Sequence, residues 1–445
     1  MPIELLTAAD SENQQRRVAG ALGRRGIGPG ERIAFVTSSS GAMLSAVLGA
    51  LRVGVVPVLL NTALLEEERA LLLADAEPSL AVDDRQLAEL LGGPPADLAP
   101  FPLARPMHYT SGTTGRPKGV WSGVLTEAEA AALAAEEAEL WGFDAADVHL
   151  VCSPLHHSAP IRFGGSTLLA GGTLVLLGRY DADRAAGAIA EHRPTTTFMV
   201  PSHLQRLFAL EQGGTSLPDL SCFRLLAHAG EPCPPPVKRA AIEAFPDGSV
   251  WEFYGATEGQ FTACPSAEWE QHPGTVGRAR PHRSLEVDDD GVVWCTVPPY
   301  ARFEYWRDPD RTAAAWRGDA FTVGDLGRLD DEGRLYLEGR RDDLVISGGV
   351  NVYPAEVEQV LSEAPGVREV AVFGVDDERW GQRVCAAVVG DVRPEEVQAY
   401  ARAHLAPYKC PKEVHLVDEL PHTSTGKLQR LAVPGLLGLD GRAGA

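Results

Sequence analysis

The chain has 445 residues, of which 44% are hydrophobic, and a formal net charge of -21 at pH 7. This length exceeds one ordinary domain, so two or more domains are expected, and the apolar content suits a large core rather than a disordered chain. The negative charge disfavours nucleic acid or an anionic membrane as a partner over most of the surface. An anionic ligand would therefore need a local cluster of donors.

The amino-terminal stretch 1–17 contains no apolar segment of signal-peptide type, and no apolar run approaches the ~20 residues that a membrane-spanning helix needs. The seven cysteines are scattered and form no CxxC pair. These features predict a cytoplasmic protein without a membrane span. Its cysteines are expected to be reduced and to form neither a metal site nor a disulfide framework.

Strand-like apolar runs alternate with helical patterns over residues 32–255. This alternation predicts an α/β fold in which parallel sheets are covered by helices on both faces. The strands are expected at 32–38, 55–60, 79–84, 148–154, 195–201, 223–230 and 249–255. The helices are expected at 42–54, 64–76, 181–192, 203–210 and 237–245.

The sequence pattern changes twice toward the carboxyl terminus. From about residue 284, short strands separated by Asp-Asp-Gly and Asp-Glu-Gly turns predict a small β-barrel-like part. From residue 342, strand and helix patterns over about 100 residues predict a small, separate α+β domain. We therefore expect a large amino-terminal domain of stacked αβα layers, residues 1–341, and a carboxyl-terminal domain, residues 342–445. The tail after Leu431 is expected to be poorly structured.

The stretch YTSGTTGRPKG, residues 109–119, combines hydroxyl side chains, glycines and two cations. Such a loop can direct amides, hydroxyls and an ammonium group toward a phosphate. It is not a Walker A sequence, because Gly115 is followed by Arg-Pro-Lys rather than by Lys and Ser or Thr. In α/β sheets ligands bind at the carboxyl ends of strands, and this turn, HAGEP (228–232) and YGATEG (254–259) all occupy such places.

The 109–119 stretch closely resembles the phosphate loop of the adenylate-forming superfamily, which contains acyl- and aryl-CoA synthetases, peptide-synthetase adenylation domains and luciferases. Four further segments occur in the family's order, and together they extend the resemblance over nearly the whole chain. They are YGATEG, GDLGRL (324–329), GRRDDLVISGGVNVYPAEVE (339–358) and TSTGKLQR (423–430). The segment 339–358 resembles free-standing acid–CoA ligases more than luciferases. The amino-terminal region is compact for this family.

The resemblance implies an enzyme that uses ATP, Mg²⁺ and coenzyme A in two steps. The carboxylate of a fatty or aryl acid attacks the α-phosphate of ATP to give an acyl-adenylate and pyrophosphate, and a thiol then displaces AMP. Both steps build negative charge on oxygen atoms, so catalysis depends mainly on correctly placed cations and donors. The residues implied to hold the phosphates are Thr110, Ser111, Gly112, Thr113, Thr114 and Lys118.

The YGATEG segment is implied to bind the rest of the nucleotide and the metal ion. Tyr254 would stack on the adenine, and Gly255 beside it is a further nucleotide-binding candidate. Thr257 would reach the α-phosphate, and Glu258 would bind Mg²⁺ through a carboxylate oxygen, the ligand type that this hard cation prefers. The loop implied to lie under the adenine consists of Gly230, Glu231 and Pro232.

The carboxyl-terminal domain is implied to be mobile and to complete the site. Asp325 and Arg340 would bind the ribose, and Asp342 matches the hinge about which the domain swings. Lys427 would bridge the substrate carboxylate and the α-phosphate, so it would stabilise charge that is present only in the transition state. After rotation, two glycines would line the pantetheine tunnel, Gly348 and Gly349.

The pocket for the acid is implied near PLHHSAP, residues 154–160. His157 occupies the family's gating position and is counted here among the catalytic candidates. His203 and His228 are further candidates for the pocket wall. A metal site made from His156 and His157 is not expected, because no third ligand is evident.

Three alternatives to coenzyme A ligation stay open. The acceptor could be the thiol of a carrier protein acting in trans, or the activated group could be nitrite, as in relatives that diazotise an aryl amine in natural-product pathways. The third alternative is a non-enzymatic nucleotide-binding regulator. The joint presence of a set of charged residues argues against it: Lys118, Glu258, Asp325, Arg340 and Lys427. The sequence also leaves open a homodimer and the identity of the acid.

Overall fold

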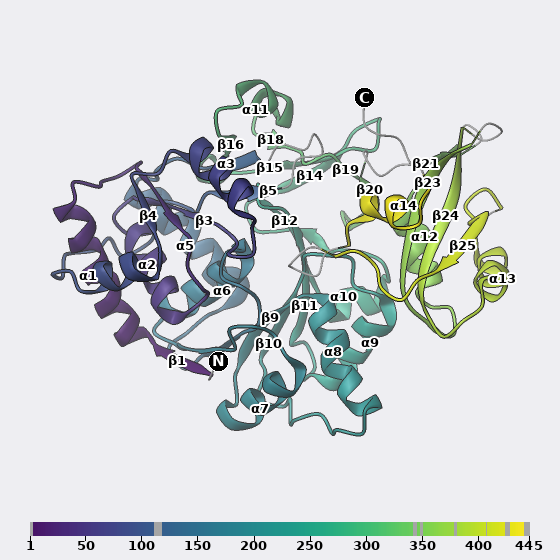
Figure 1. Cartoon of the computed structure of the whole chain (residues 1–445), viewed down its shortest axis with the longest axis horizontal. Helices are drawn as coiled ribbons and strands as arrows, with labels where there is room; N and C mark the ends of the chain where they lie inside the picture. The colour runs from purple at the N-terminus through teal and green to yellow at the C-terminus, as the bar shows by residue number, and fades with distance from the viewer. Residues whose placement is uncertain are drawn as a thin grey trace.

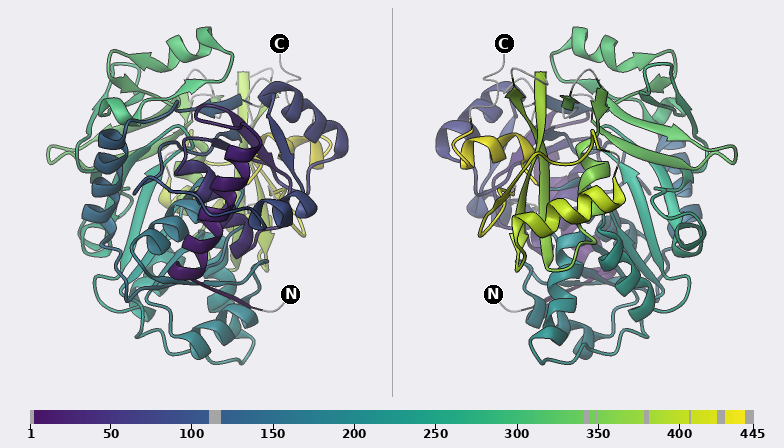
Figure 2. Two further views of the ribbon diagram at one scale, coloured as in Figure 1. Left: turned by 90° about the vertical axis from the view of Figure 1, so that its left-hand side faces the viewer. Right: turned by 90° about the vertical axis from the view of Figure 1, so that its right-hand side faces the viewer.

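The computed structural model describes residues 3–110, 118–340, 345–347, 350–377, 381–405, 407–422 and 428–439. Figure 1 shows a larger amino-terminal part and a smaller carboxyl-terminal part, which follow one another along the long axis. The right-hand view of Figure 2 looks onto the smaller part, drawn in green to yellow, with the larger part behind it. None of the described helices is both long and apolar enough to cross a membrane.

An eight-stranded sheet forms the centre of the larger part. In spatial order its strands are β1 (Glu4–Thr7), β8 (Thr173–Leu176), β7 (Val148–Val151), β9 (Thr196–Met199), β10 (Leu225–His228), β11 (Val250–Gly255), β12 (Gln260–Pro265) and β13 (Arg278–Ala279). The five strands from β8 to β11 are parallel, as the alternating pattern predicts. The edge strands β1, β12 and β13 pair antiparallel, which the pattern does not predict. Strand β12 can be antiparallel because a short turn, instead of a crossover helix, joins it to β11.

Helices cover both faces of this sheet, because side chains on its strands alternate between two apolar layers. Met199 packs into the layer beneath α7 (Ala182–His192), α8 (Pro201–Gln212) and α9 (Pro235–Ala244). Its neighbour Phe198 packs into the opposite layer, with Trp141 of α5 (Glu127–Trp141) and Phe163 of α6 (Ser158–Leu169). The expected αβα layering is therefore confirmed.

A second, three-stranded parallel sheet lies before the 109–119 stretch. Its strands in spatial order are β3 (Val56–Leu59), β2 (Arg32–Phe35) and β4 (Leu80–Val82). The helices of this region are α1 (Ala8–Arg24), α2 (Gly41–Leu51), α3 (Glu66–Ala76) and α4 (Asp84–Leu91). Helix α2 is buried on nearly all sides, which its continuous apolar sequence predicts.

Short antiparallel strands form the expected β-rich part. One sheet contains β14 (Ser284–Val287), β15 (Val293–Thr296), β18 (Ala320–Phe321) and β17 (Trp316–Arg317), and a hairpin contains β19 (Asp325–Leu329) and β20 (Leu335–Arg340). A third group joins β16 (Glu304–Tyr305), β6 (Lys118–Trp121) and β5 (His108–Thr110). The pairing of β16 with β6 matters for the site, because it brings Tyr305 opposite Val120. The short helices of these regions are α10 (Ser266–Gln271), α11 (Pro309–Ala315) and the 3-10 helix η1 (Pro299–Ala301).

The carboxyl-terminal part is a small α+β unit, as expected. Its strands are β22 (Val350–Val352), β21 (Val345–Ser347), β24 (Gly381–Gly390), β23 (Val367–Asp377) and β25 (Glu413–Leu416), and its helices are α12 (Pro354–Leu361), α13 (Pro394–His404), η3 (Arg430–Ala432) and α14 (Val433–Leu436). Helix α14 corrects the expectation of a poorly structured tail, because Val433 is fully buried against Phe373 and Leu420. The predicted boundary at residues 341–342 falls outside the described residues and stays a prediction.

Candidate active site

Part of the predicted site lies outside the described residues. These predicted residues are Ser111, Gly112, Thr113, Thr114, Asp342, Gly348, Gly349 and Lys427. Thr110 ends β5, and Arg340 ends β20 opposite Asp325. The described site therefore consists of the residues around the carboxyl ends of β9, β10 and β11, together with Lys118 and Asp325.

The turn between β11 and β12 places two of the predicted residues. Strand β11 ends at Gly255, and the backbone N–H of Ala256 donates to the carbonyl of Gly259 at 2.8 Å, which closes the turn. A Cβ atom on Gly255 would lie 2.8 Å from Gln260 Oε1 and 2.9 Å from the Gly259 carbonyl, so this position needs glycine. Thr257 and Glu258 occupy the middle of the turn, and Glu258 is only 4% exposed.

A contact group joins Lys118, whose side chain is partly exposed, to the buried residues Glu258 and Tyr305. Lys118 Nζ lies 3.1 Å from Glu258 Oε1, and it also donates to the hydroxyl of Tyr305 at 3.1 Å. The Tyr305 hydroxyl in turn donates to Glu258 Oε1 at 2.8 Å. The ammonium group also lies 4.5 Å from the centre of the Tyr305 ring, a favourable cation–π arrangement. The predicted phosphate-binding lysine and the predicted metal ligand are therefore adjacent in space.

Tyr254, near the end of β11, contacts Asp325. The Tyr254 hydroxyl donates to Asp325 Oδ2 at 2.5 Å, and the Tyr254 ring packs on Phe261 at 4.7 Å between ring centres. Asp325 is 7% exposed and begins β19. The structure thus brings the predicted adenine-stacking ring and the predicted ribose-binding carboxylate into direct contact, although they are 71 residues apart.

The predicted adenine loop follows β10. Gly230 adopts a φ of +101°, a backbone conformation that glycine reaches at low cost. The carboxylate of Glu231 accepts a hydrogen bond from the backbone N–H of Ser202 at 3.1 Å, which ties this loop to the start of α8. Pro232 follows directly. Because β10 and β11 are parallel neighbours, the loop that follows β10 lies beside the end of β11, where Tyr254 is located.

His157 is the residue that precedes α6, and its ring contacts the ring of His156 at 4.1 Å between centres. Burial lowers the pKa of His157 to about 3 and that of His156 to about 4, so both imidazoles are neutral near pH 7. A neutral, packed imidazole is compatible with the predicted role of His157 as a residue that gates the acid pocket. Neither imidazole contributes positive charge for binding a phosphate.

The other two histidine candidates, His203 and His228, are both buried. His203, on α8, stacks on Tyr180, which precedes α7, with 3.9 Å between the ring centres, and burial lowers the pKa of His203 to about 4. His228 is fully buried at the end of β10, near the ion pair between Lys238 and Glu252. Ala227 packs on the face of the sheet that α5 covers. Successive side chains of a strand point to opposite faces, so His228 points to the face that α9 covers. Their place in one pocket wall with His157 stays a prediction.

Two features of the site were missed by sequence reasoning. Tyr305 holds both Lys118 and Glu258, and its only sequence signal is its place in the segment FEYW, which has no phosphate-binding pattern. An aromatic layer beneath the site was also missed. It includes Phe163, Phe198 and Phe253, whose ring centres lie 5.7–5.9 Å apart. Aromatic residues spread over three elements carry no motif that a sequence alone reveals.

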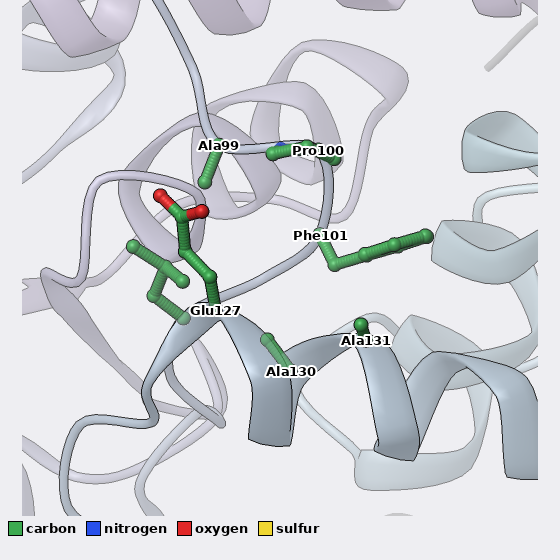
Figure 3. Close-up of a pocket in the computed structure, with 7 residues that line it drawn as sticks. Ala99, Pro100, Phe101, Glu127, Ala130 and Ala131 are labelled. Carbon is green, nitrogen blue, oxygen red and sulfur yellow. The ribbon is translucent and has the colours of Figure 1, made fainter.

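A small pocket lies outside this site. It is formed between the first turns of α5 and the stretch 99–103 that precedes β5, and Figure 3 shows Glu127 and Phe101 at its edges. Its volume is about 170 Å³, and its walls are mainly apolar. None of the predicted site residues lines it.

Comparisons with known proteins agree with this geometry. The model of the AMP-binding enzyme family matches residues 3–99 and 105–294, and the model of the AMP-binding enzyme C-terminal domain matches residues 356–427. A 2-succinylbenzoate–CoA ligase of Bacillus cereus is 34% identical over 436 residues, which cover 91% of this chain and 88% of the relative.

Two solved structures are also similar over nearly their whole length. ATP-bound MatB from Rhodopseudomonas palustris has a TM-score of 0.84 and 29% identity, with 96% of this chain and 93% of that chain covered. The o-succinylbenzoate CoA synthetase from Bacillus subtilis, in complex with its acyl-adenylate intermediate, has a TM-score of 0.82 and 28% identity, with 98% and 94% covered.

Proposed function

Because the chain belongs to the family of AMP-binding enzymes, we propose that it activates an organic acid with ATP and transfers the acyl group to the thiol of coenzyme A. In the first step a carboxylate oxygen of the acid bonds to the α-phosphorus of ATP, and pyrophosphate leaves. In the second step the thiol sulfur bonds to the acyl carbon, AMP leaves, and the thiol proton is released. The observation that carries this proposal is the contact group of Lys118, Glu258 and Tyr305 beside the Tyr254–Asp325 pair.

Lys118 supplies the positive charge for the phosphates. Its ammonium group is already oriented by Glu258 and Tyr305, so little reorganisation is needed when the substrate binds. Asp325 supplies a carboxylate for the ribose hydroxyls, and Tyr254 holds that carboxylate through its own hydroxyl. Lys118 and Asp325 would thus hold the nucleotide at its phosphates and at its ribose.

Glu258 fits the requirements of a Mg²⁺ ligand. Lys118 and Tyr305 both contact this carboxylate at Oε1, and a buried carboxylate is a suitable oxygen ligand for a hard cation. When bound there, Mg²⁺ would supply positive charge that neutralises the phosphate oxygens. Lys118 and Tyr305 would then keep the Glu258 carboxylate in a single orientation.

Lys427 and the Gly348–Gly349 segment complete the proposal from the sequence, since they lie outside the described residues. Lys427 would stabilise the first transition state, and the two glycines would admit the pantetheine arm for the second step. Coenzyme A is favoured over a carrier-protein thiol because the curated relative reported above is a CoA ligase that the chain matches over most of its length.

One assay tests the proposal. Purified protein is supplied with ATP, Mg²⁺ and one acid at a time, drawn from aliphatic, aryl and dicarboxylic acids, with nitrite as a separate arm. Pyrophosphate release and product mass are recorded with and without coenzyme A. Acid-dependent release followed by a CoA thioester mass supports the proposal. Release with nitrite alone, or no release with any acid, contradicts it. The variant Glu258→Gln serves as the control that should lose acid-dependent release.

A further inference from the structure

Three side chains of the kinds that bind transition metals lie together on the carboxyl-terminal sheet. They are Cys385 of β24 and Glu413 and His415 of β25, two strands that lie side by side in the smaller part of the molecule (Figure 1). The thiol sulfur, a carboxylate oxygen and a ring nitrogen all lie within 4.8 Å of one another. We call these residues the Cys–Glu–His group. It contains none of the residues assigned to the candidate active site.

The pairing of β24 with β25 brings the group together. The two strands are parallel, and Cys385 lies directly opposite Glu413. Side chains two positions apart on a strand point to the same face of a sheet, so Glu413 and His415 project together. The residues between and beside them, Val414 and Ala386, pack into the apolar layer on the opposite face. All three candidate ligands therefore share one face.

Two of the candidate ligand atoms already have the separation that a zinc ion requires. His415 Nε2 lies 3.4 Å from Glu413 Oε2. Tetrahedral Zn²⁺ binds imidazole nitrogen and carboxylate oxygen at about 2.0–2.2 Å, which places two such atoms about 3.3–3.6 Å apart. His415 Nε2 is also buried without a hydrogen-bond partner in the described part of the chain. With the ring proton on Nδ1, this nitrogen can bind a metal ion without losing a hydrogen bond to those residues.

The group is open to solvent on one side. Cys385 is 0% exposed, whereas the side chains of His415 and Glu413 are 29% and 43% exposed. A metal ion can therefore reach the buried sulfur by passing these two side chains. Three protein ligands leave one position of a tetrahedral site for a water molecule.

Arg383 is the cation that competes for this place. Its Nε lies 3.2 Å from Glu413 Oε1, and its Nη2 contacts Oε2, the oxygen nearer His415, more loosely at 3.5 Å. Its Nη1 lies 3.5 Å from Asp377 Oδ2, so a second carboxylate stands beside the guanidinium. The charges of Zn²⁺ and Arg383 would balance those of Asp377, Glu413 and a Cys385 thiolate. A bound metal ion would therefore leave no uncompensated charge among these groups.

The chemistry of the ligands favours Zn²⁺ over Mg²⁺. Thiolate is a soft ligand that suits zinc, and imidazole suits zinc as well, whereas Mg²⁺ prefers oxygen ligands alone. The scattered cysteines and the lack of a CxxC pair predict no metal site. That prediction considers the spacing of cysteines, whereas in the fold a carboxylate and an imidazole from another strand join a single cysteine.

We propose that Cys385, Glu413 and His415 bind one Zn²⁺ ion, which links β24 to β25 and stabilises the carboxyl-terminal domain. The sulfur, one carboxylate oxygen and Nε2 of the imidazole each donate an electron pair to the ion, and the thiol proton is released to solvent. The ion is structural and takes no part in the activation of the acid. It anchors the strand that precedes Lys427 along the chain.

The test uses the full chain without an affinity tag, first treated with a chelator and then titrated with Co²⁺ as a spectroscopic substitute for Zn²⁺. Cobalt bound to a thiolate gives a charge-transfer absorption in the near ultraviolet, and a tetrahedral site gives intense visible bands. One equivalent of Co²⁺ should produce both signals, and Zn²⁺ should abolish them. Zn²⁺ should also raise the melting temperature, because it binds the native state. Saturating Co²⁺ without the thiolate absorption would overturn the proposal.

Two ligand variants and one matched control identify the site. Cys385→Ser should remove the near-ultraviolet absorption, and His415→Gln, at a partly exposed position, should preserve the fold. Each should weaken Zn²⁺ binding by at least about 100-fold, because losing a residue that merely orients a ligand already costs about 10- to 100-fold. Cys410→Ser is the control, since Cys410 is buried in the apolar layer on the opposite face. Unchanged zinc affinity in His415→Gln, or equal losses in Cys385→Ser and Cys410→Ser, would refute the assignment.

The variant Arg383→Gln distinguishes a metal site from a simple ion-pair network. Removing the competing guanidinium from Glu413 should tighten Zn²⁺ binding by about tenfold, the effect of one nearby like charge. A network that binds no metal predicts instead that Arg383→Gln lowers the melting temperature and that Zn²⁺ does not restore it. Metal binding and unfolding are the only readouts, so the result does not depend on the proposed acid activation.

Discussion

The hydroxyl of Tyr305, on β16, donates a 2.8 Å hydrogen bond to Oε1 of Glu258, which lies 47 positions earlier in the turn between β11 and β12. The same hydroxyl accepts a hydrogen bond from Lys118 Nζ at 3.1 Å. The backbone holds Tyr305 through the pairing of β16 with β6 and through a 2.9 Å hydrogen bond from its N–H to Thr312 Oγ1. Tyr305 therefore acts as a positioning residue for both charged groups.

The variant Tyr305→Phe tests this role. The ring should stay in its apolar cluster, so the fold should be preserved, while both hydroxyl contacts are lost. We expect an increase of about tenfold in KM for the nucleotide with a smaller change in kcat, because one hydrogen bond to each charged group is removed. Steady-state kinetics at varied ATP measures this. Tyr336→Phe, which loses only a 3.4 Å contact to Asp330, is the control. An equal rise in KM in both variants would refute the assignment.

Asp325 is expected to determine affinity for the ribose of the nucleotide. In Asp325→Asn the carboxylate charge is lost while the size of the side chain is kept, and the Tyr254 hydroxyl retains an acceptor. We expect ATP to bind about 10- to 100-fold more weakly, the range for hydrogen bonds to a charged group. Equilibrium binding of ATP measures the change directly. Asp319→Asn provides the comparison, since that carboxylate is 75% exposed. Unchanged ATP affinity in Asp325→Asn would place the ribose elsewhere.

Lys427 is expected to act in the first step only. The variant Lys427→Ala should lower the rate of adenylate formation by about 10²- to 10³-fold, the scale for removing one donor that stabilises transition-state charge. Conversion of a preformed acyl-adenylate into the CoA thioester should survive. Each half-reaction is measured separately, by pyrophosphate exchange and by thioester formation. If the rates of both half-reactions fell equally, Lys427 would not act in the first step alone, and the proposed swing of a mobile domain between the two steps would be wrong.

Buried histidines should make the protein sensitive to mild acid. Burial lowers the pKa of His228 to about 4 and that of His149 to about 3, whereas an unfolded histidine titrates near pH 6.5. As the pH falls from 6.5 toward 4, the unfolded state therefore binds protons that the native state does not. The free energy of unfolding should decrease over this window, by up to about 1.4 kcal/mol per pH unit for each such histidine.

The variant His228→Leu isolates one of these groups. Both ring nitrogens of His228 are buried without a hydrogen-bond partner among the described residues, so the substitution removes a titrating group without breaking a hydrogen bond to those residues. Urea unfolding between pH 7.5 and 4.5 should show a shallower loss of stability for the variant than for the wild-type protein. Parallel pH profiles for the two proteins would mean that His228 does not contribute to the acid sensitivity.

Much of the fold could be predicted from the alternation of apolar runs and helical patterns. The strands around Ile33, Leu150 and Leu226 form where continuous apolar segments predict them, because strands buried on both faces need such segments. The antiparallel pairing of β12 and β13 was not predicted. It depends on the tight turn that follows Gly255, which folds β12 back beside β11. Helix α14 was missed because its burial depends on the distant strand β23.

The amino-acid sequence was enough to name the candidate chemical groups of the site and their order along the chain. Lys118, Glu258 and Asp325 stand in short segments of glycines and hydroxyl residues, and such segments are local, so they can be read without knowing the fold. The neighbours of these groups became evident only in the folded chain. The contact of Tyr305 with Glu258 and the pairing of Arg162 with Glu137 join residues from separate elements, and no local pattern encodes a distance between elements that meet only after folding.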